Sequence, residues 1–180
     1  SADHLTQMPF DGFAIGGLAV GEGKDQRNDF CELTAAMLPR NLPRYLMGVG
    51  TPLDLLEAVH RGVDMFDCIM PVEQAQRGVA FTTRGKFQLR RTVYKHAEEA
   101  LDPACPCPTC ASYSRAYLHH LTKTTEVLGW QLISTHNLWF YHRLMADMRA
   151  HILAGTFASF HAAMRHELDR DDEEHPPQHR

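Results

Sequence analysis

The feature that most constrains the fold is an alternation of apolar runs and amphipathic helices in the first 70 residues. Three apolar runs have the length of buried strands, at residues 13–20, 45–49 and 63–70. Helical spacing fills the two intervals: Pro39 ends the first helix, and Thr51 and Pro52 begin the second as N-cap and first helical residue. Strands that alternate with helices across short loops are typical of parallel βαβ units. We therefore predict an α/β fold.

Three parallel strands are too few to complete such an architecture. They cannot close a barrel, and an all-parallel sheet needs cover on both faces. The 180 residues are 44% hydrophobic and 22% charged, which is ordinary for a globular protein. No apolar run reaches the roughly 18 residues that a membrane-spanning helix needs. We expect a non-membrane protein that is part of something larger.

The character of the sequence changes after residue 71, where a hairpin and a cysteine-rich loop replace the alternation. A helix is expected over 113–128, ended by Gly129, and a long helix from about 137 to 153. The last residues are acidic, polar and proline-containing, which predicts disorder. The expected organisation is parallel β/α units over 1–71, a basic hairpin and metal-binding subdomain over 72–136, a closing helix over 137–160 and a disordered acidic tail over 161–180.

A cysteine cluster of the form C-x-C-x2-C is followed after 25 intervening residues by a histidine: Cys105, Cys107, Cys110 and His136. Three thiolates and one imidazole are a common closed ligand set for structural zinc. On spacing alone His119 and His120 compete for the fourth position, although we expect both to face solvent or RNA. Five cysteines, three of them within six residues, indicate a metal site in a reducing compartment such as the cytoplasm. The alternative is a loop without metal.

Residues 77–96 contain six Lys or Arg and no acidic residue. Two arms at 79–83 and 87–93 flank Arg84-Gly85-Lys86 and predict a β-hairpin. Phosphates attract clustered cations, and unpaired bases stack on aromatic and guanidinium planes. We predict RNA contacts here, with a merely solvated hairpin as the alternative. The proposed RNA-contacting residues are Arg77, Arg84, Lys86, Arg90 and Arg91.

The third apolar run holds two carboxylates, Asp64 and Asp67, which strand periodicity directs to opposite faces. A carboxylate in such a run is costly to bury unless it is hydrogen-bonded or functional. Functional groups gather at the carboxyl ends of parallel strands, and a carboxylate can attack the anomeric carbon of a sugar. We predict Asp67 as a candidate nucleophile; the alternative is a capping or ion-paired carboxylate.

Several segments together resemble one family, the tRNA-guanine transglycosylases, also called queuine tRNA-ribosyltransferases. They run in the family's order and spacing: GFAIGGLAVGE at 12–22, RYLMGVGTP at 44–52, GVDMFDC at 62–68, the C-x-C-x2-C-x25-H set, and SRAYLHHL at 114–121. The resemblance implies the C-terminal part of a (β/α)8, or TIM, barrel with an inserted zinc-binding subdomain. It also implies exchange of guanine at the tRNA wobble position for a 7-deazaguanine.

The resemblance further implies a role for individual residues. Asp67 matches the nucleophile that attacks the ribose and holds the RNA covalently until the incoming base displaces it. His136 matches the fourth ligand of Zn2+, beside the three cysteines. The residues that match the base-binding site are the loop Gly17, Leu18 and Ala19 and the sandwiching side chains Tyr45 and Met47.

Two features depart from the family pattern. The chain resembles only its C-terminal half; the second Asp, a general acid/base, and the Asp and Gln that read the guanine edge lie upstream of the matching part. In addition, the usual P-T-R-x-x-R-N-G reads PVEQAQRG at 71–78. Glu73 and Gln76 thus replace two arginines that contact the anticodon loop, and Arg77 replaces the Asn. Glu in place of Arg turns attraction for phosphate into repulsion.

Two functional hypotheses follow. The first is the C-terminal part of a transglycosylase or a diverged paralogue, acting as a homodimer or with a complementing N-terminal half. The alternative is a non-catalytic zinc module that binds tRNA or pairs with a catalytic subunit. The intact Asp67 and GGLAVGE segment favour the first hypothesis, and PVEQAQRG favours an altered RNA partner.

Overall fold

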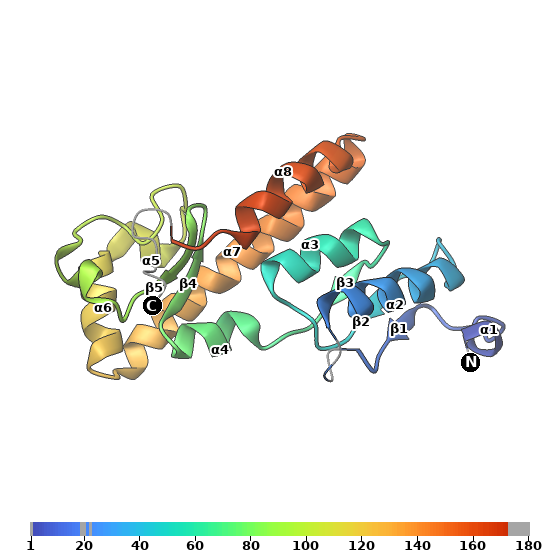
Figure 1. The fold of residues 1–180 in the computed structure, drawn as a ribbon, viewed down its shortest axis with the longest axis horizontal. Helices are drawn as coiled ribbons and strands as arrows, with labels where there is room; N and C mark the ends of the chain where they lie inside the picture. The colour runs from blue at the N-terminus through green and yellow to red at the C-terminus, as the bar shows by residue number, and fades with distance from the viewer. Residues whose placement is uncertain (1, 19–20, 22, 173–180) are drawn as a thin grey trace. The chain divides into compact units, whose positions relative to one another are not determined.

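The structure is a computed structural model that describes residues 2–18, 21 and 23–172 (Figure 1). Its contacts divide the chain into two compact units, Ser1–Ile69 and Met70–Arg180. The division falls close to the change in character expected after residue 71. Each unit has its own buried apolar cluster, so each is a separately packed body.

The first unit is built on a three-stranded parallel sheet with the order β1-β2-β3. The βαβαβ order predicted from the sequence is confirmed, although the strands are shorter than the apolar runs. Helix α2 contacts both β1 and α3. The elements are α1 (Ala2–Leu5), β1 (Phe13–Ile15), α2 (Lys24–Met37), β2 (Arg44–Leu46), α3 (Pro52–His60) and β3 (Met65–Phe66).

Helix α3 begins where the sequence predicts. The Thr51 side chain accepts a hydrogen bond from the Asp54 backbone N–H at 3.2 Å, and the Asp54 carboxylate accepts one from the Thr51 N–H, which completes a capping box. Pro52 occupies the first turn, where a missing N–H costs nothing. The predicted start of α3 is therefore confirmed.

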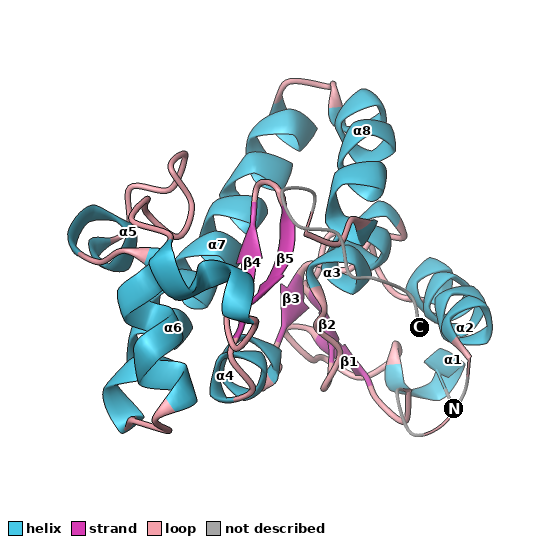
Figure 2. Cartoon of the chain, turned by 60° about the vertical axis from the view of Figure 1, so that its left-hand side comes forward, coloured by secondary structure: helices cyan, strands magenta, loops and turns pink. Residues whose placement is uncertain are grey.

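The second unit combines an antiparallel hairpin with helices (Figure 2). The predicted hairpin is confirmed, and β4 packs against the long helix α7. The turn of the hairpin is Thr83-Arg84, and the second arm expected over 87–93 is the strand Gly85–Gln88 followed by a 3-10 helix. None of the helices in the described part of the chain is long and apolar enough to cross a membrane. The elements are α4 (Met70–Gln76), β4 (Val79–Thr82), β5 (Gly85–Gln88), the 3-10 helix η1 (Thr92–His96), α5 (Pro108–Ser112), α6 (Arg115–Lys123), α7 (Val127–Leu153) and α8 (Phe157–Asp169).

The predicted helix over 113–128 is confirmed only over Arg115–Lys123, and Gly129 does not end it. The long helix expected from about residue 137 starts earlier, at Val127. The chain turns at 124–126, where Thr125 has a φ of 57°, and α7 begins before Gly129. A Cβ added to Gly129 would lie 2.8 Å from the Cβ of Leu121 on α6. Gly129 therefore permits the close approach of α6 and α7 rather than ending a helix.

The C-terminal prediction also needs correction. Residues 161–169, expected to be part of a disordered tail, belong to α8. Helix α8 packs on α7, and the rings of His151 and Phe160 stack with centroids 4.3 Å apart. Phe157 and Phe160, at helical spacing, favour a helix that packs on α7, although the residues after them are polar. Residues 173–180 lie outside the described part.

Candidate active site and metal centre

Three loops leave the sheet of the first unit at the same edge. Gly16 follows β1, Met47 follows β2 and Asp67 follows β3. Parallel pairing aligns Ile15 with Leu46, and Leu46 with Phe66, so these three residues emerge side by side. The carboxyl edge of a parallel sheet is where α/β enzymes place their reacting groups.

The Asp67 carboxylate is exposed but held in place. Its Oδ1 accepts a hydrogen bond of 2.6 Å from the Tyr45 hydroxyl and one of 2.9 Å from the Gly48 backbone N–H. These donors stabilise the charged form, so they lower the pKa of Asp67. Oδ2 receives neither bond. The arrangement presents an ionised, oriented carboxylate to solvent, as a carboxylate nucleophile requires.

Glycines shape the loops around this carboxylate. Gly48 has a φ of 70°, a conformation that places its N–H on Asp67 and that other residues rarely adopt. A Cβ added to Gly50 would lie 2.1 Å from the sulfur of Cys68. Glycines at 48 and 50 therefore let the loop after β2 approach Asp67 and its neighbour Cys68 closely.

Asp64 has a different role. Its Oδ2 accepts a hydrogen bond of 2.9 Å from the backbone N–H of Arg44, the first residue of β2. Asp64 therefore holds the backbone of the neighbouring strand, whereas Asp67 accepts hydrogen bonds from a side-chain hydroxyl and from a loop N–H. The two carboxylates of the third apolar run thus have different partners.

The structure describes all but one of the residues that we expect to bind a base. Gly17, with a φ of 76°, is exposed, and Leu18 is half-buried against the core of the first unit. Ala19 lies outside the described residues. Met47 is 46% exposed, and its sulfur would lie 3.3 Å from a Cβ on Gly16. Tyr45 directs its hydroxyl to Asp67, a contact that the sequence did not reveal.

The four predicted metal ligands come together in the second unit. One ligand atom from each of Cys105, Cys107, Cys110 and His136 lies within 4.8 Å of the others. His136 Nδ1 is 3.6 Å from the Cys107 sulfur and 3.3 Å from that of Cys110. Tetrahedral zinc with bonds of about 2.3 Å to sulfur and about 2.0 Å to nitrogen would separate such ligands by roughly 3.5 Å. The group fits a metal of this size.

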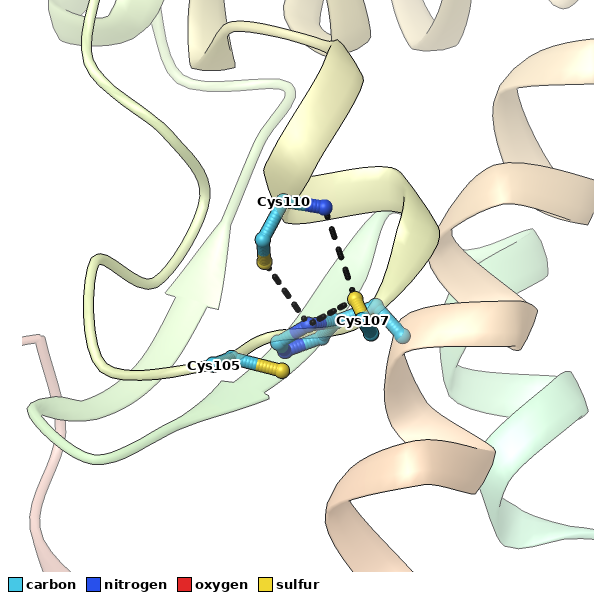
Figure 3. A group of neighbouring side chains, drawn as sticks. Cys105, Cys107 and Cys110 are labelled. Carbon is cyan, nitrogen blue, oxygen red and sulfur yellow. Dashed lines mark hydrogen bonds between the residues drawn. The ribbon is translucent and has the colours of Figure 1, made fainter.

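Local structure arranges these ligands. Cys107 is the N-cap of α5, where its sulfur accepts a hydrogen bond from the Cys110 backbone N–H, and Pro108 occupies the first turn. Figure 3 shows the sulfurs of the three labelled cysteines gathered around one small space. His136 comes from α7. The cysteine loop and a helix distant in sequence therefore meet at this group.

The protonation of the group also suits a metal. Burial raises the pKa of Cys107, but hydrogen bonds from His136 and from the Cys110 N–H outweigh it and lower that pKa to about 6. Burial raises the pKa of Cys110, and against burial the three cysteines raise the pKa of His136. A cation at this position would replace the shared protons as the partner of the thiolates.

His136 and its neighbour Asn137 also hold strand β4. His136 Nε2 lies 2.7 Å from the Phe81 carbonyl oxygen, which leaves Nδ1 toward the cysteines. Asn137 Oδ1 accepts from the Phe81 N–H at 3.0 Å, and Nδ2 donates to the carbonyls of Pro71 and Val79. Sequence reasoning missed Asn137, although its position beside a ligand histidine was visible.

The expected exposure of both histidines on α6 is half wrong. His119 is buried, and its Nδ1 lies 2.6 Å from the Leu89 carbonyl oxygen, so it ties α6 to the segment after the hairpin. His120 is exposed. Neither joins the cysteine group among the described residues.

Comparison with known proteins assigns the chain to a family. A family model described as queuine tRNA-ribosyltransferase matches residues 1–170. The chain belongs to this family.

Curated relatives support the assignment. The queuine tRNA-ribosyltransferase of Novosphingobium aromaticivorans is 55% identical over 167 residues, which are 92% of this chain and 44% of that protein. The one from Francisella tularensis subsp. novicida is 51% identical over 156 residues, 87% of this chain and 42% of that protein. The chain spans less than half the length of these queuine tRNA-ribosyltransferases.

Most of the residues predicted to contact RNA lie in or next to the hairpin. Arg84 is in its turn, Lys86 is on β5, and Arg90 and Arg91 follow β5. Lys86 is 3.4 Å from Asp171 and Arg91 is 3.0 Å from Asp172, both measured between nitrogen and carboxylate oxygen. The hairpin thus gathers four of the five predicted RNA-contacting residues.

The fifth predicted RNA-contacting residue, Arg77, lies beside Glu73, which stands where the family pattern has an arginine. Its guanidinium lies 2.6 Å from the Glu73 carboxylate, one turn earlier on α4. The side chains are 63% and 31% exposed, so the pair is worth little in stability. Glu73 nevertheless competes with any phosphate for Arg77.

Proposed function

We propose that this chain carries the nucleophile, part of the base-binding site and the RNA-binding region of a tRNA-guanine transglycosylase. The supporting observation is the exposed Asp67 carboxylate at the carboxyl edge of the sheet, whose pKa is lowered by Tyr45 and Gly48. Groups whose pKa is shifted by specific partners cluster at functional sites.

In the proposed reaction a carboxylate oxygen of Asp67 attacks C1′ of the target ribose. The bond from C1′ to guanine breaks, and guanine departs with the electron pair and takes up a proton. The incoming 7-deazaguanine, preQ1 or queuine, then attacks C1′ through nitrogen, loses a proton, and releases Asp67. Tyr45 and Gly48 hold the carboxylate ionised and aimed, and Gly17, Leu18, Ala19 and Met47 contribute to base binding.

We assign Zn2+ to Cys105, Cys107, Cys110 and His136. Four protein ligands leave no open position, so the ion would contribute folding energy and not chemistry. It would fix the cysteine loop, α7 and strand β4 in one arrangement, on which the basic hairpin rests. The observation behind this assignment is the agreement of ligand distances with tetrahedral zinc.

The proposed assembly is a TIM barrel completed by further β/α units, in a homodimer or with a complementing N-terminal half, in the cytoplasm. Its partners would be tRNA and the guanine or 7-deazaguanine base. Open strand edges on β1 and β3 support this proposal, because within the described residues each pairs with one neighbour. The general acid/base and guanine-reading residues would come from the added part.

The deciding experiment is incorporation of labelled guanine into bulk tRNA by the chain alone and with the N-terminal part of a relative. Asp67→Asn is the control. We expect exchange with the complemented protein that disappears in the variant, and a covalent RNA adduct that forms only with Asp67. Exchange that persists in Asp67→Asn would contradict the assignment.

The alternative is a non-catalytic tRNA-binding or partner subunit, favoured by Glu73 at a position where the family carries arginine. In that case tRNA binds, but no adduct forms under any complementation. Arg90→Glu tests the RNA surface common to both proposals, with the equally exposed Arg149→Glu on α7 as control. We expect at least tenfold weaker tRNA binding and a flatter salt dependence for Arg90→Glu alone.

A further inference from the structure

The C-terminal segment, meaning here residues 170–172 after α8, lies on the basic hairpin. After α8 ends, Asp171 forms a parallel β-bridge with Lys86, and its carboxylate lies 3.4 Å from the Lys86 ammonium. A Cβ added to Gly85 would lie 2.2 Å from the Asp171 carbonyl oxygen. The hairpin therefore meets this segment through a glycine that leaves room for it.

The next residue anchors the segment. The Asp172 side chain is 2% exposed. It accepts a hydrogen bond of 3.0 Å from Arg91 and another from the Tyr94 hydroxyl. Burial and this carboxylate raise the pKa of Tyr94, so the hydroxyl remains a donor. A buried carboxylate held by a guanidinium and a hydroxyl is a firm attachment point.

The two contacts differ in strength. Lys86 and Asp171 are 44% and 59% exposed, and an exposed pair of this kind is weak and easily exchanged. Asp172 is buried and Arg91 is half-buried, and breaking that pair would leave the buried carboxylate without its cationic partner. The segment is thus fixed at Asp172 and exchangeable at Asp171.

We propose that Asp172 anchors the C-terminal segment so that the Asp171 carboxylate occupies a phosphate position at Lys86 and lowers the affinity of the hairpin for RNA. This inference rests on the proposed function, since it concerns the same RNA surface. Carboxylate and phosphate oxygens compete for the same ammonium group. RNA binding displaces Asp171 from Lys86 while Asp172 stays in place.

The test compares Asp171→Asn with Asp169→Asn in binding of bulk tRNA. Both variants lose one negative charge, but Asp169 is exposed and forms no ion pair with any described residue. We expect Asp171→Asn to bind tRNA about two- to fivefold more tightly than Asp169→Asn at low salt. The slope of log K against log salt should steepen by about 0.7, because one more phosphate contact forms.

Lys86→Met separates the possible failures. If Lys86→Met weakens binding and Asp171→Asn has no further effect in that background, the competition is confirmed. If Lys86→Met weakens binding but Asp171→Asn behaves as Asp169→Asn does, the inference is wrong and the RNA surface stands. If neither Lys86→Met nor Arg90→Glu changes binding, the hairpin is not an RNA surface, and both the RNA-surface assignment and this inference are overturned. Thermal melting of each variant verifies that the fold is kept.

Discussion

The two candidate sites of this chain are built in opposite ways. Asp67 is exposed at the edge of a sheet, and within the described part of the chain it is held by hydrogen bonds from Tyr45 on β2 and from Gly48 in the loop that follows. The cysteine-histidine group is mostly buried and belongs to the apolar core of the second unit, with Cys107 and Cys110 among its members. A reacting group has to meet its substrate, whereas a structural metal group gains from being enclosed.

The difference predicts where each site is vulnerable. Changes at Asp67 should alter chemistry and leave the fold intact, because few contacts depend on its side chain. Changes at the metal group should alter the fold of the second unit, because ligands, helix cap and strand contacts coincide there. The comparison would fail if the first unit also unfolded without metal, or if the second did not.

Loss of the metal group has the largest expected effect. Cys110→Ala or zinc removal by a chelator should abolish cooperative folding of the second unit, since structural zinc contributes on the order of 10 kcal/mol to such sites. Hydrogen exchange should show rapid exchange over β4, α5 and the start of α7 but unchanged protection in β1–β3. Cys31→Ala, in the core of the first unit, is the matched control and should keep one zinc per chain. Zinc retained by Cys110→Ala would refute the ligand set.

Asn137→Ala should have an intermediate effect. The substitution leaves the Phe81 N–H and two carbonyls without their partner in a fully buried place, at a cost of about 2–3 kcal/mol. Urea unfolding in excess zinc measures this loss, and metal content should remain one per chain. Gln131→Ala, an exposed amide on the same helix, should change stability by less than about 0.5 kcal/mol. Equal losses of stability in the two variants would show that the Asn137 hydrogen bonds do not stabilise the second unit.

Much of both sites could be read from the sequence, because their signals are local. The βαβαβ order, the start of α3 at Thr51-Pro52, the hairpin and the cysteine cluster all follow from residues close together in the chain. The choice of His136 over His119 and His120 needed the family resemblance, because spacing alone left it open. The roles of Asn137 and the Tyr45 hydroxyl could not be read, since each depends on which distant backbone or carboxylate tertiary packing brings near.

The wrong predictions share that physical reason. Gly129 carries a strong local signal for a helix end, but the contact with Leu121 uses the missing side chain instead. The end of α8 was assigned to the tail because composition hid the packing of Phe160 on His151. In both cases a contact between neighbouring helices outweighed local propensity.

Tyr45→Phe has the smallest expected effect. It should change the chemistry of Asp67 without changing stability, unlike any change at the metal group. Tyr45→Phe removes a donor to Asp67 but little packing, so stability should hardly change. Because the Tyr45 hydroxyl lowers the pKa of Asp67, its removal should raise that pKa, and the loss of covalent RNA capture on acidification should begin at higher pH. NMR titration of the Asp67 carboxyl carbon measures the shift in the chain alone, independently of activity. Tyr117→Phe, in the exposed stacked pair with Tyr113, should leave the titration where it is. An unchanged titration in Tyr45→Phe would mean that the Gly48 amide alone orients the carboxylate.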